Sequence, residues 1–122
     1  MRIVEAVQNH MLTQMLDLCK HELDLIELPE IVFIDTDSTT DSGTSFGEFN
    51  NDKIEVVSKG RHPMDVMRTL AHELVHWKQM VSGMPLNGED GSDTENQANS
   101  IAGIIMRRFG KMHPEYFMDS IA

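Results

Sequence analysis

Residues 69–77 read Thr69-Leu70-Ala71-His72-Glu73-Leu74-Val75-His76-Trp77, and this stretch decides how the rest of the chain is interpreted. It contains the pattern His-Glu-x-x-His. On an α-helix, residues four positions apart lie on one face, with their Cβ atoms about 5–6 Å apart. His72 and His76 can therefore direct their imidazole rings at one metal ion. Glu73 stands beside that point, where a carboxylate can act as the general base toward a metal-bound water.

The residues around this motif predict an amphipathic helix over 63–82. A step of about 100° per residue separates an apolar arc from a polar one. The apolar arc holds Met64, Val66, Met67, Leu70, Ala71, Leu74, Val75, Trp77 and Val81, and the polar arc holds Asp65, Arg68, Thr69, His72, Glu73, His76 and Gln79. Pro63 suits the first turn, where its missing N–H has no helical partner. The alternative interpretation is a helix with two surface histidines and no metal.

The composition indicates one globular domain over residues 1–122. Hydrophobic residues make up 40% and charged residues 25% of the chain, as in ordinary globular proteins. The net charge of −10 argues against binding to a phosphate backbone, so we expect no nucleic-acid partner. No apolar run is long enough for a bilayer, and residues 1–10 lack a signal-peptide core. Cys19 is the only cysteine, so we expect a cytoplasmic protein without disulfides or membrane contact.

The hydrophobic pattern along the chain predicts an α+β fold. We expect a first helix over 2–26, an apolar strand over 31–34, and a β-hairpin formed by 44–49 and 53–57. The central helix is followed by a helix over 93–109, which Gly110 is placed to stop, and by a short last helix from Pro114. Together these elements predict a small, three-stranded, mainly antiparallel sheet with helices around it.

A third metal ligand has to come from outside the motif, because a catalytic zinc normally takes three protein ligands and leaves one position for water. We choose Glu95, since it shares a helical stripe with the apolar residues Ala98, Ala102, Ile105 and Phe109. A carboxylate pointing inward with that stripe needs a partner. Ser92 and Glu95 also match a capping box, in which the carboxylate bonds the Ser92 backbone and no metal is needed.

Several other polar residues are secondary candidates. Asp90, Asp93 and His113 are the reserve choices for the third ligand. Asn99 follows Glu95 by one helical turn, and Asp65 and Thr69 precede the histidines on the polar arc. From these positions a side chain can hydrogen-bond a ligand histidine and fix its ring.

The motifs His72-Glu73-x-x-His76 and Glu95-x-x-Ala98 resemble those of the gluzincin clan of zinc metallopeptidases, particularly its minimal members, the minigluzincins. Residues 60–62 and 68–76 also look like small SprT-like peptidase homologues encoded by tailed phages, whose compartment would be the host cytoplasm. The resemblance covers residues 44–109. It implies one Zn²⁺ per chain, a peptide or protein substrate, and hydrolysis with Glu73 as base.

The resemblance also implies that an extended substrate pairs with an edge strand, here Thr44 to Phe49. It leaves the residue that stabilises the oxyanion open among His62, Arg108, His113 and Tyr116. Two rival interpretations remain: a zinc-binding module that docks to a partner without proteolysis, and a structural protein without metal. Glu73 argues against the first, since a structural zinc has no use for a base and usually takes four protein ligands.

Overall fold

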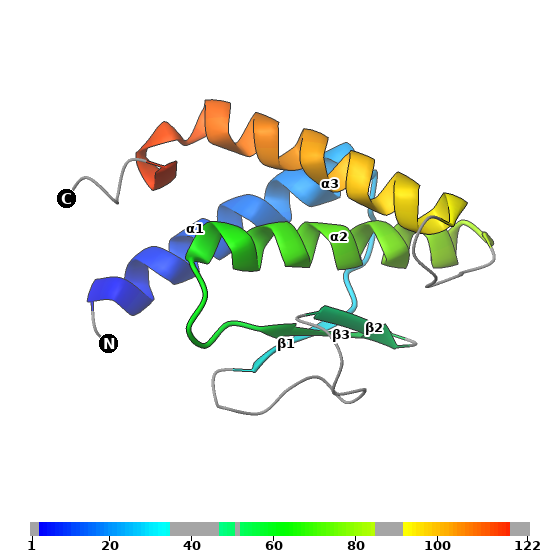
Figure 1. Ribbon diagram of the computed structural model, residues 1–122, viewed down its shortest axis with the longest axis horizontal. Helices are drawn as coiled ribbons and strands as arrows, with labels where there is room; N and C mark the ends of the chain where they lie inside the picture. Colours follow the sequence, from blue (N-terminus) through cyan, green and yellow to red (C-terminus); the bar gives the residue numbers. More distant parts are fainter. Residues whose placement is uncertain (1–2, 35–46, 51, 85–91, 118–122) are drawn as a thin grey trace.

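The computed structural model describes residues 3–34, 47–50, 52–84 and 92–117, and these ranges confirm the α+β class (Figure 1). The elements are the helices α1 (Ile3–Glu22), α2 (Pro63–Val81) and α3 (Asp93–Met112), the strands β1 (Glu30–Ile34), β2 (Gly47–Asn50) and β3 (Lys53–Val57), and a last 3₁₀ turn, η1 (Pro114–Phe117). None of the helices in these ranges combines the length and the apolar character needed to cross a membrane.

Helix α2 is the middle layer of the fold. Figure 1 shows the sheet on one side of α2 and the helices α1 and α3 on the other. The apolar arc of α2 packs into the core through Leu70 and Leu74, together with Met15 of α1 and with Ile105 and Phe109 of α3. Since β2 and β3 also contact α2, this helix is covered from both sides, and part of its polar arc is buried as well.

The sheet is mixed, with the strand order β1-β3-β2. β2 and β3 form the expected antiparallel hairpin, in which Gly47 is opposite Val56 and Asn50 is opposite Lys53. β1 joins the other side of β3 in parallel, from Glu30 opposite Lys53 onward. Residues 44–46 of the expected hairpin lie outside the described ranges. β2 is therefore an outer strand of the described sheet.

Two helix boundaries differ from the prediction. α1 ends at Glu22 rather than at 26, because Asp24 turns into the left-handed region with φ of 52°. The prediction that Gly110 stops α3 was wrong, since the helix continues to Met112. His113 caps the helix and directly precedes Pro114, and a proline disfavours the helical conformation of the residue before it.

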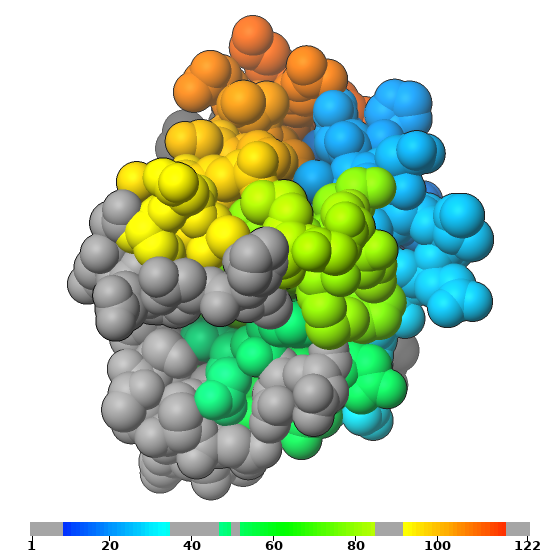
Figure 2. Space-filling view, turned by 90° about the vertical axis from the view of Figure 1, so that its right-hand side faces the viewer, coloured from blue at the N-terminus to red at the C-terminus, as the bar shows by residue number. Residues whose placement is uncertain are grey.

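The predicted burial of Val81 was also wrong, because 53% of this residue is exposed. Val81 is the last residue of α2, where the apolar arc runs beyond the core. Figure 2 shows this end of the molecule, with the beginning of α3 (yellow) beside the end of α2 (light green) and the strands below. The beginning of α3 and the last turns of α2 are therefore neighbours in space.

Strand β2 approaches α2 very closely at Gly47. A Cβ atom built on Gly47 would overlap Cγ2 of Thr69 and lie 3.1 Å from Oε2 of Glu73. Thr69 cannot easily turn away, because its hydroxyl accepts from Nη2 of Arg61 at 2.8 Å and donates to the carbonyl oxygen of Asp65 at 3.0 Å. Glycine at position 47 is therefore required to bring the backbone of β2 next to Glu73.

We predict that Gly47→Ala destabilises the protein by about 1–3 kcal/mol, the usual cost of overpacking. This loss would exceed the gain expected from replacing a glycine inside a strand. Adding Thr69→Ser removes Cγ2 and keeps the hydroxyl, so the double variant should recover more than half of the loss. Urea unfolding of the two single variants and the double variant measures this coupling.

Gly103→Ala is the matched control, because nothing lies within 4 Å of a Cβ at this position in α3. It should stabilise the protein by about 0.5–1 kcal/mol, since alanine is the better helix former. Equal unfolding free energies for Gly47→Ala and the wild type would contradict the close approach of β2.

Candidate metal centre

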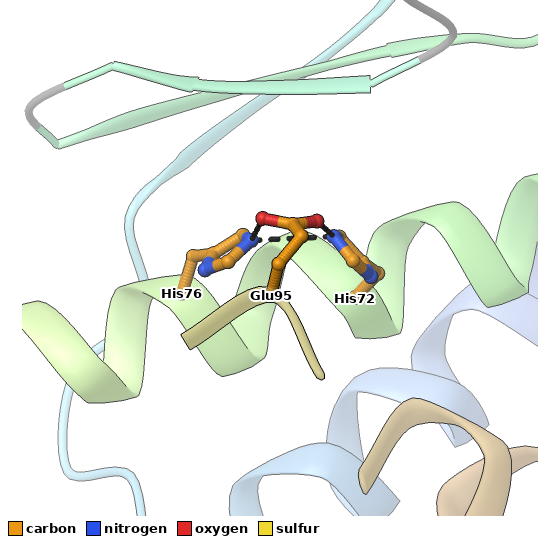
Figure 3. A group of neighbouring side chains, drawn as sticks. All are labelled: His72, His76 and Glu95. Atoms are coloured by element: carbon orange, nitrogen blue, oxygen red, sulfur yellow. Dashed lines mark hydrogen bonds and ion pairs between the residues drawn. The ribbon is translucent and has the colours of Figure 1, made fainter. Parts of the chain in front are cut away.

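Three side chains from two helices converge on one point between α2 and α3. His72 and His76 extend from consecutive turns of α2, and Glu95 extends from the first turn of α3 to meet them (Figure 3). The carboxylate lies between the rings, with Oε1 2.7 Å from Nε2 of His72 and Oε2 3.0 Å from Nε2 of His76. The atoms of His72, His76 and Glu95 that could bind a metal all lie within 4.8 Å of one another. The predicted triad is thus brought together by the fold.

The spacing of the two histidines fits a shared metal ion. Their Nε2 atoms are 3.2 Å apart, and two nitrogen ligands of one tetrahedral zinc lie about 3.3 Å apart. Without a metal, a proton on each Nε2 would be needed to satisfy both carboxylate oxygens, and the two N–H groups would face each other. A cation removes this conflict, because both nitrogens and the carboxylate can then direct lone pairs at it.

Glu95 contacts the histidines with its carboxylate, while the cap of its helix is provided by Ser92. The Ser92 hydroxyl oxygen accepts a hydrogen bond from the backbone N–H of Glu95 at 3.3 Å, which is one half of a capping box. The observed contacts favour Glu95 as ligand over Glu95 as cap. Of the reserve candidates, Asp90 lies outside the described residues, Asp93 is exposed, and His113 follows the other end of α3.

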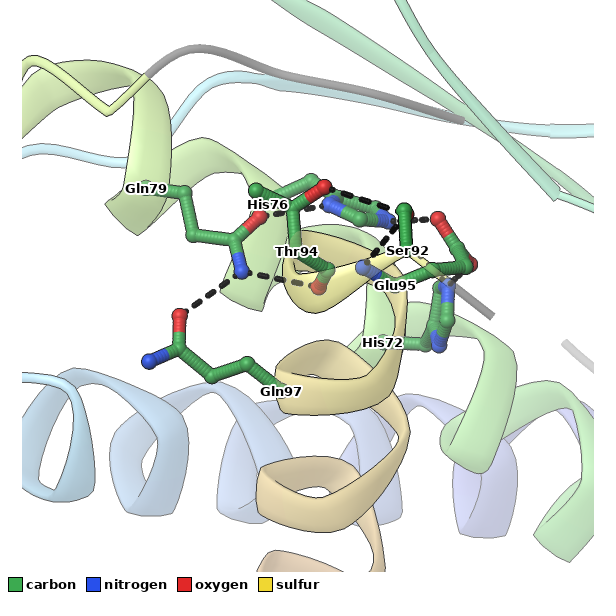
Figure 4. A network of polar contacts seen from close by, with 7 residues as sticks. All are labelled: His72, His76, Gln79, Ser92, Thr94, Glu95 and Gln97. Carbon is green, nitrogen blue, oxygen red and sulfur yellow. Dashed lines mark hydrogen bonds and ion pairs between the residues drawn. The ribbon is translucent and has the colours of Figure 1, made fainter. Parts of the chain in front are cut away.

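His76 has a second partner that the sequence did not reveal. Its Nδ1 atom lies 2.7 Å from Oε1 of Gln79, which is buried at 2% exposure. The Nε2 atom of Gln79 in turn donates to the carbonyl oxygen of Thr94 at 3.0 Å and to Oε1 of Gln97 at 2.8 Å. Figure 4 shows this network running from α2 into the first turn of α3. In the sequence, only the presence of a long polar side chain on a mainly buried helix could have indicated that Gln79 has buried polar partners.

The environment of His72 favours the neutral ring that a metal ligand needs. Burial lowers the pKa of His72, and this outweighs the nearby charge of Glu95 and the hydrogen bond with Asn99, both of which act in the opposite direction. Asn99 thus affects the pKa of His72, the residue whose ring it was expected to orient. Thr69 instead bonds Arg61 and the Asp65 carbonyl, as described above.

Glu73 lies beside the triad in a gap closed by β2. Only 7% of the residue is exposed. Burial, together with the charges of Glu95 and Glu48, raises the pKa of Glu73 to about 8. A cation held by the triad would oppose this shift and favour the carboxylate form. Glu73 is thus a confined carboxyl group whose protonation would respond to a cation bound by the triad.

The four oxyanion candidates have other positions and partners. His62 caps α2 by accepting from the Met64 N–H at 3.0 Å, about 15 Å from His72 at the rise of about 1.5 Å per helical residue. Arg108 pairs with Glu22 on α1, His113 caps the end of α3, and Tyr116 donates to Gln14. These contacts give them structural roles in the described part of the chain.

A separate cavity of about 240 Å³ lies between α1, β1 and the start of α2. It is lined by Asn9, Met11, Leu12, Phe33, Ser58, Arg61, Pro63, Val66 and Met67. None of the triad residues lines it. The guanidinium of Arg61 in its wall donates to the Val57 carbonyl at 2.8 Å as well as to Thr69. The cavity is therefore distinct from the candidate metal centre.

Comparisons of the chain with protein-family models, curated proteins and solved structures found no match. The functional interpretation therefore depends on the residues and on the geometry of the site.

We predict that Glu95→Ala lowers zinc affinity by more than about 100-fold, beyond the loss that follows removal of a second-shell group. The metal-free variant should remain folded, because the apolar core is unchanged. A competition titration against a chromophoric chelator gives the affinity, and urea unfolding gives the stability.

Ser92→Ala separates the ligand role from the capping role. It removes the cap and should cost about 1 kcal/mol of stability, while zinc affinity stays close to that of the wild type. The opposite pattern, with full affinity in Glu95→Ala and reduced stability of its metal-free form, would make Glu95 a capping residue.

Proposed function

We propose that this chain is a zinc-dependent metallopeptidase that hydrolyses peptide bonds in a peptide or protein substrate. One Zn²⁺ per chain would be held by His72, His76 and Glu95, with Glu73 as the general base. The observation that carries this proposal is the convergence of the three ligand groups within 4.8 Å, beside a buried fourth carboxyl group that contacts the outer strand.

The choice of zinc and of hydrolysis follows from the ligand set. Two imidazoles and one carboxylate form a set that catalytic zinc uses, and three protein ligands leave one position for water. A structural zinc site would usually fill that position with a fourth protein ligand. A structural site also gives no reason to bury Glu73 next to the ligands, where its charge is costly.

Glu73 would perform the proton transfers of the reaction. Bound zinc supplies Lewis acidity, which lowers the pKa of a coordinated water toward about 7 and polarises a carbonyl group. Glu73 in its carboxylate form would accept a proton from the attacking water and deliver it to the leaving amine. Its confinement between α2 and β2 limits the rotamers of the side chain and keeps the carboxyl group beside the triad.

Strand β2 supports the expected position of the substrate. It is an outer strand of the described sheet, and Gly47 brings its backbone into contact with the Glu73 side chain. A substrate that binds in extended form along β2 would extend the sheet. Its backbone would then pass beside Glu73, as the proposed reaction requires.

We predict that Glu73→Gln retains fold and zinc affinity but loses peptide hydrolysis by at least about 100-fold, the lower end of what general acid–base catalysis contributes. The amide has nearly the same size as the carboxyl group and cannot accept the proton. Mass spectrometry of a peptide library incubated with zinc-loaded wild type and variant measures the difference.

Gly103→Ala serves as the control in this assay, since Gly103 lies on α3 away from the triad, with open space around it. Equal cleavage by wild type and Glu73→Gln would remove Glu73 from the mechanism. A zinc-loaded wild type that cleaves no peptide would favour the zinc-binding interaction module.

A further inference from the structure

Gln79 is the most deeply buried polar side chain of α2, and the proposed reaction gives it no role. It lies three residues after His76 on the same face and is 2% exposed. A buried amide of this size is costly unless its polar atoms are paired. The three hydrogen bonds described above satisfy it, and they connect the two helices that carry the metal ligands.

The orientation of this amide is determined by its partners. The carbonyl oxygen of Thr94 can only accept a hydrogen bond, so the group 3.0 Å from it has to be the NH₂ of Gln79. Oε1 of Gln97 accepts from the same NH₂ at 2.8 Å. Oε1 of Gln79 must therefore be the atom that faces Nδ1 of His76 at 2.7 Å.

This orientation fixes the tautomer of His76. An amide oxygen can only accept, so Nδ1 of His76 has to carry the proton that it shares with Gln79. A neutral imidazole has one N–H, and the hydrogen bond of one ring nitrogen decides the state of the other. Nε2 then has a free lone pair, and it points to the place where His72 and Glu95 converge (Figure 4).

The same amide controls where Glu95 lies. Thr94 precedes Glu95 in the first turn of α3, so the bond from Gln79 to the Thr94 carbonyl ties that turn to α2. Gln97 adds a second attachment one turn of α3 further on. One buried side chain of α2 therefore holds both a ligand histidine and the segment that carries the third ligand.

We propose that Gln79 is the positioning residue of the metal centre: it selects the Nδ1–H tautomer of His76 and docks the first turn of α3, so that His76 and Glu95 present lone pairs to one ion. This inference rests on the zinc site of the proposed function, although it does not require that the site cleaves peptides. In this proposal, the contact between α2 and α3 orients two metal ligands in addition to packing the helices together.

The test compares two variants with the wild type. Gln79→Met has a similar volume and no hydrogen-bonding group, so it removes both effects. Gln79→Glu still accepts from Nδ1 of His76 but has no NH₂ for Thr94 or Gln97, so it keeps the tautomer and weakens the docking of α3. Asn99→Ala is the control, because Asn99 bonds His72 and leaves the partner of His76 intact.

The first measurement is the nitrogen NMR spectrum of zinc-loaded protein labelled with ¹⁵N-histidine, which reports which ring nitrogen of His76 carries the proton and how fast that proton exchanges with water. We expect a protonated Nδ1 with slow exchange in the wild type, in Gln79→Glu and in Asn99→Ala, and fast exchange or loss of the Nδ1 proton in Gln79→Met. The second measurement is zinc affinity by competition with a chelator. We expect Gln79→Met to lose about 10–100-fold, as second-shell changes do, and Gln79→Glu to lose less.

Two outcomes would overturn the assignment. One is a zinc-loaded wild type in which His76 carries its proton on Nε2, a result that needs no variant to fold. The other is a zinc-loaded Gln79→Met protein whose Nδ1 proton on His76 exchanges as slowly as in the wild type, whatever its affinity, since packing alone would then explain any loss. A zinc-loaded wild type that cleaves no peptide refutes the peptidase proposal but leaves this assignment intact, because both measurements are independent of activity.

Discussion

Helix α2 is covered by the sheet on one side and by α1 and α3 on the other. Because of this cover, the polar residues of α2 need partners within the protein. Glu73, His76 and Gln79 belong to that arc and are buried. A buried polar group without a partner costs on the order of 1–3 kcal/mol, and more if it is charged. The elements that cover α2 must therefore provide polar contacts as well as apolar ones. The candidate metal centre lies where these polar contacts are made.

The first turn of α3 provides most of these contacts. Ser92 caps the helix, the Thr94 carbonyl accepts from Gln79, and the Glu95 carboxylate reaches both histidines. Since the same few residues cap α3, dock it and contribute a ligand, a change in the position of α3 would alter the ligand set. Through this coupling, two helices that are separate in sequence bring three side chains to one point.

The sequence was sufficient for features that depend on periodicity within one element. The 3.6-residue repeat located α2, the spacing of His72 and His76 predicted that their rings converge, and the inward stripe of α3 predicted that Glu95 meets them. Features that depend on contacts with another helix or strand could not be predicted from the sequence. The role of Gln79 requires knowing that Thr94 and Gln97 face it, and the parallel pairing of β1 with β3 depends on how distant strands meet.

Local signals failed where the surroundings decide the outcome. Gly110 is a frequent type of helix stop, yet α3 continues past it, because Phe109 packs into the core and Pro114 supplies a stronger stop a few residues later. Val81 continues the apolar repeat of α2 but lies beyond the elements that would cover it. In both cases the usual preference of the residue type was overruled by the packing of neighbouring parts of the chain.

The charges around the triad favour a bound cation, as its geometry does. Burial, together with the charges of Glu95 and Glu48, raises the pKa of Glu73 to about 8. The Nε2 atoms of His72 and His76 lie 3.2 Å apart and face the same carboxylate. A protein interior tolerates such a concentration of negative charge poorly unless a cation neutralises it. Binding of a divalent ion would relieve this repulsion and return Glu73 to the carboxylate form, so the same event would stabilise the fold and prepare the proposed base.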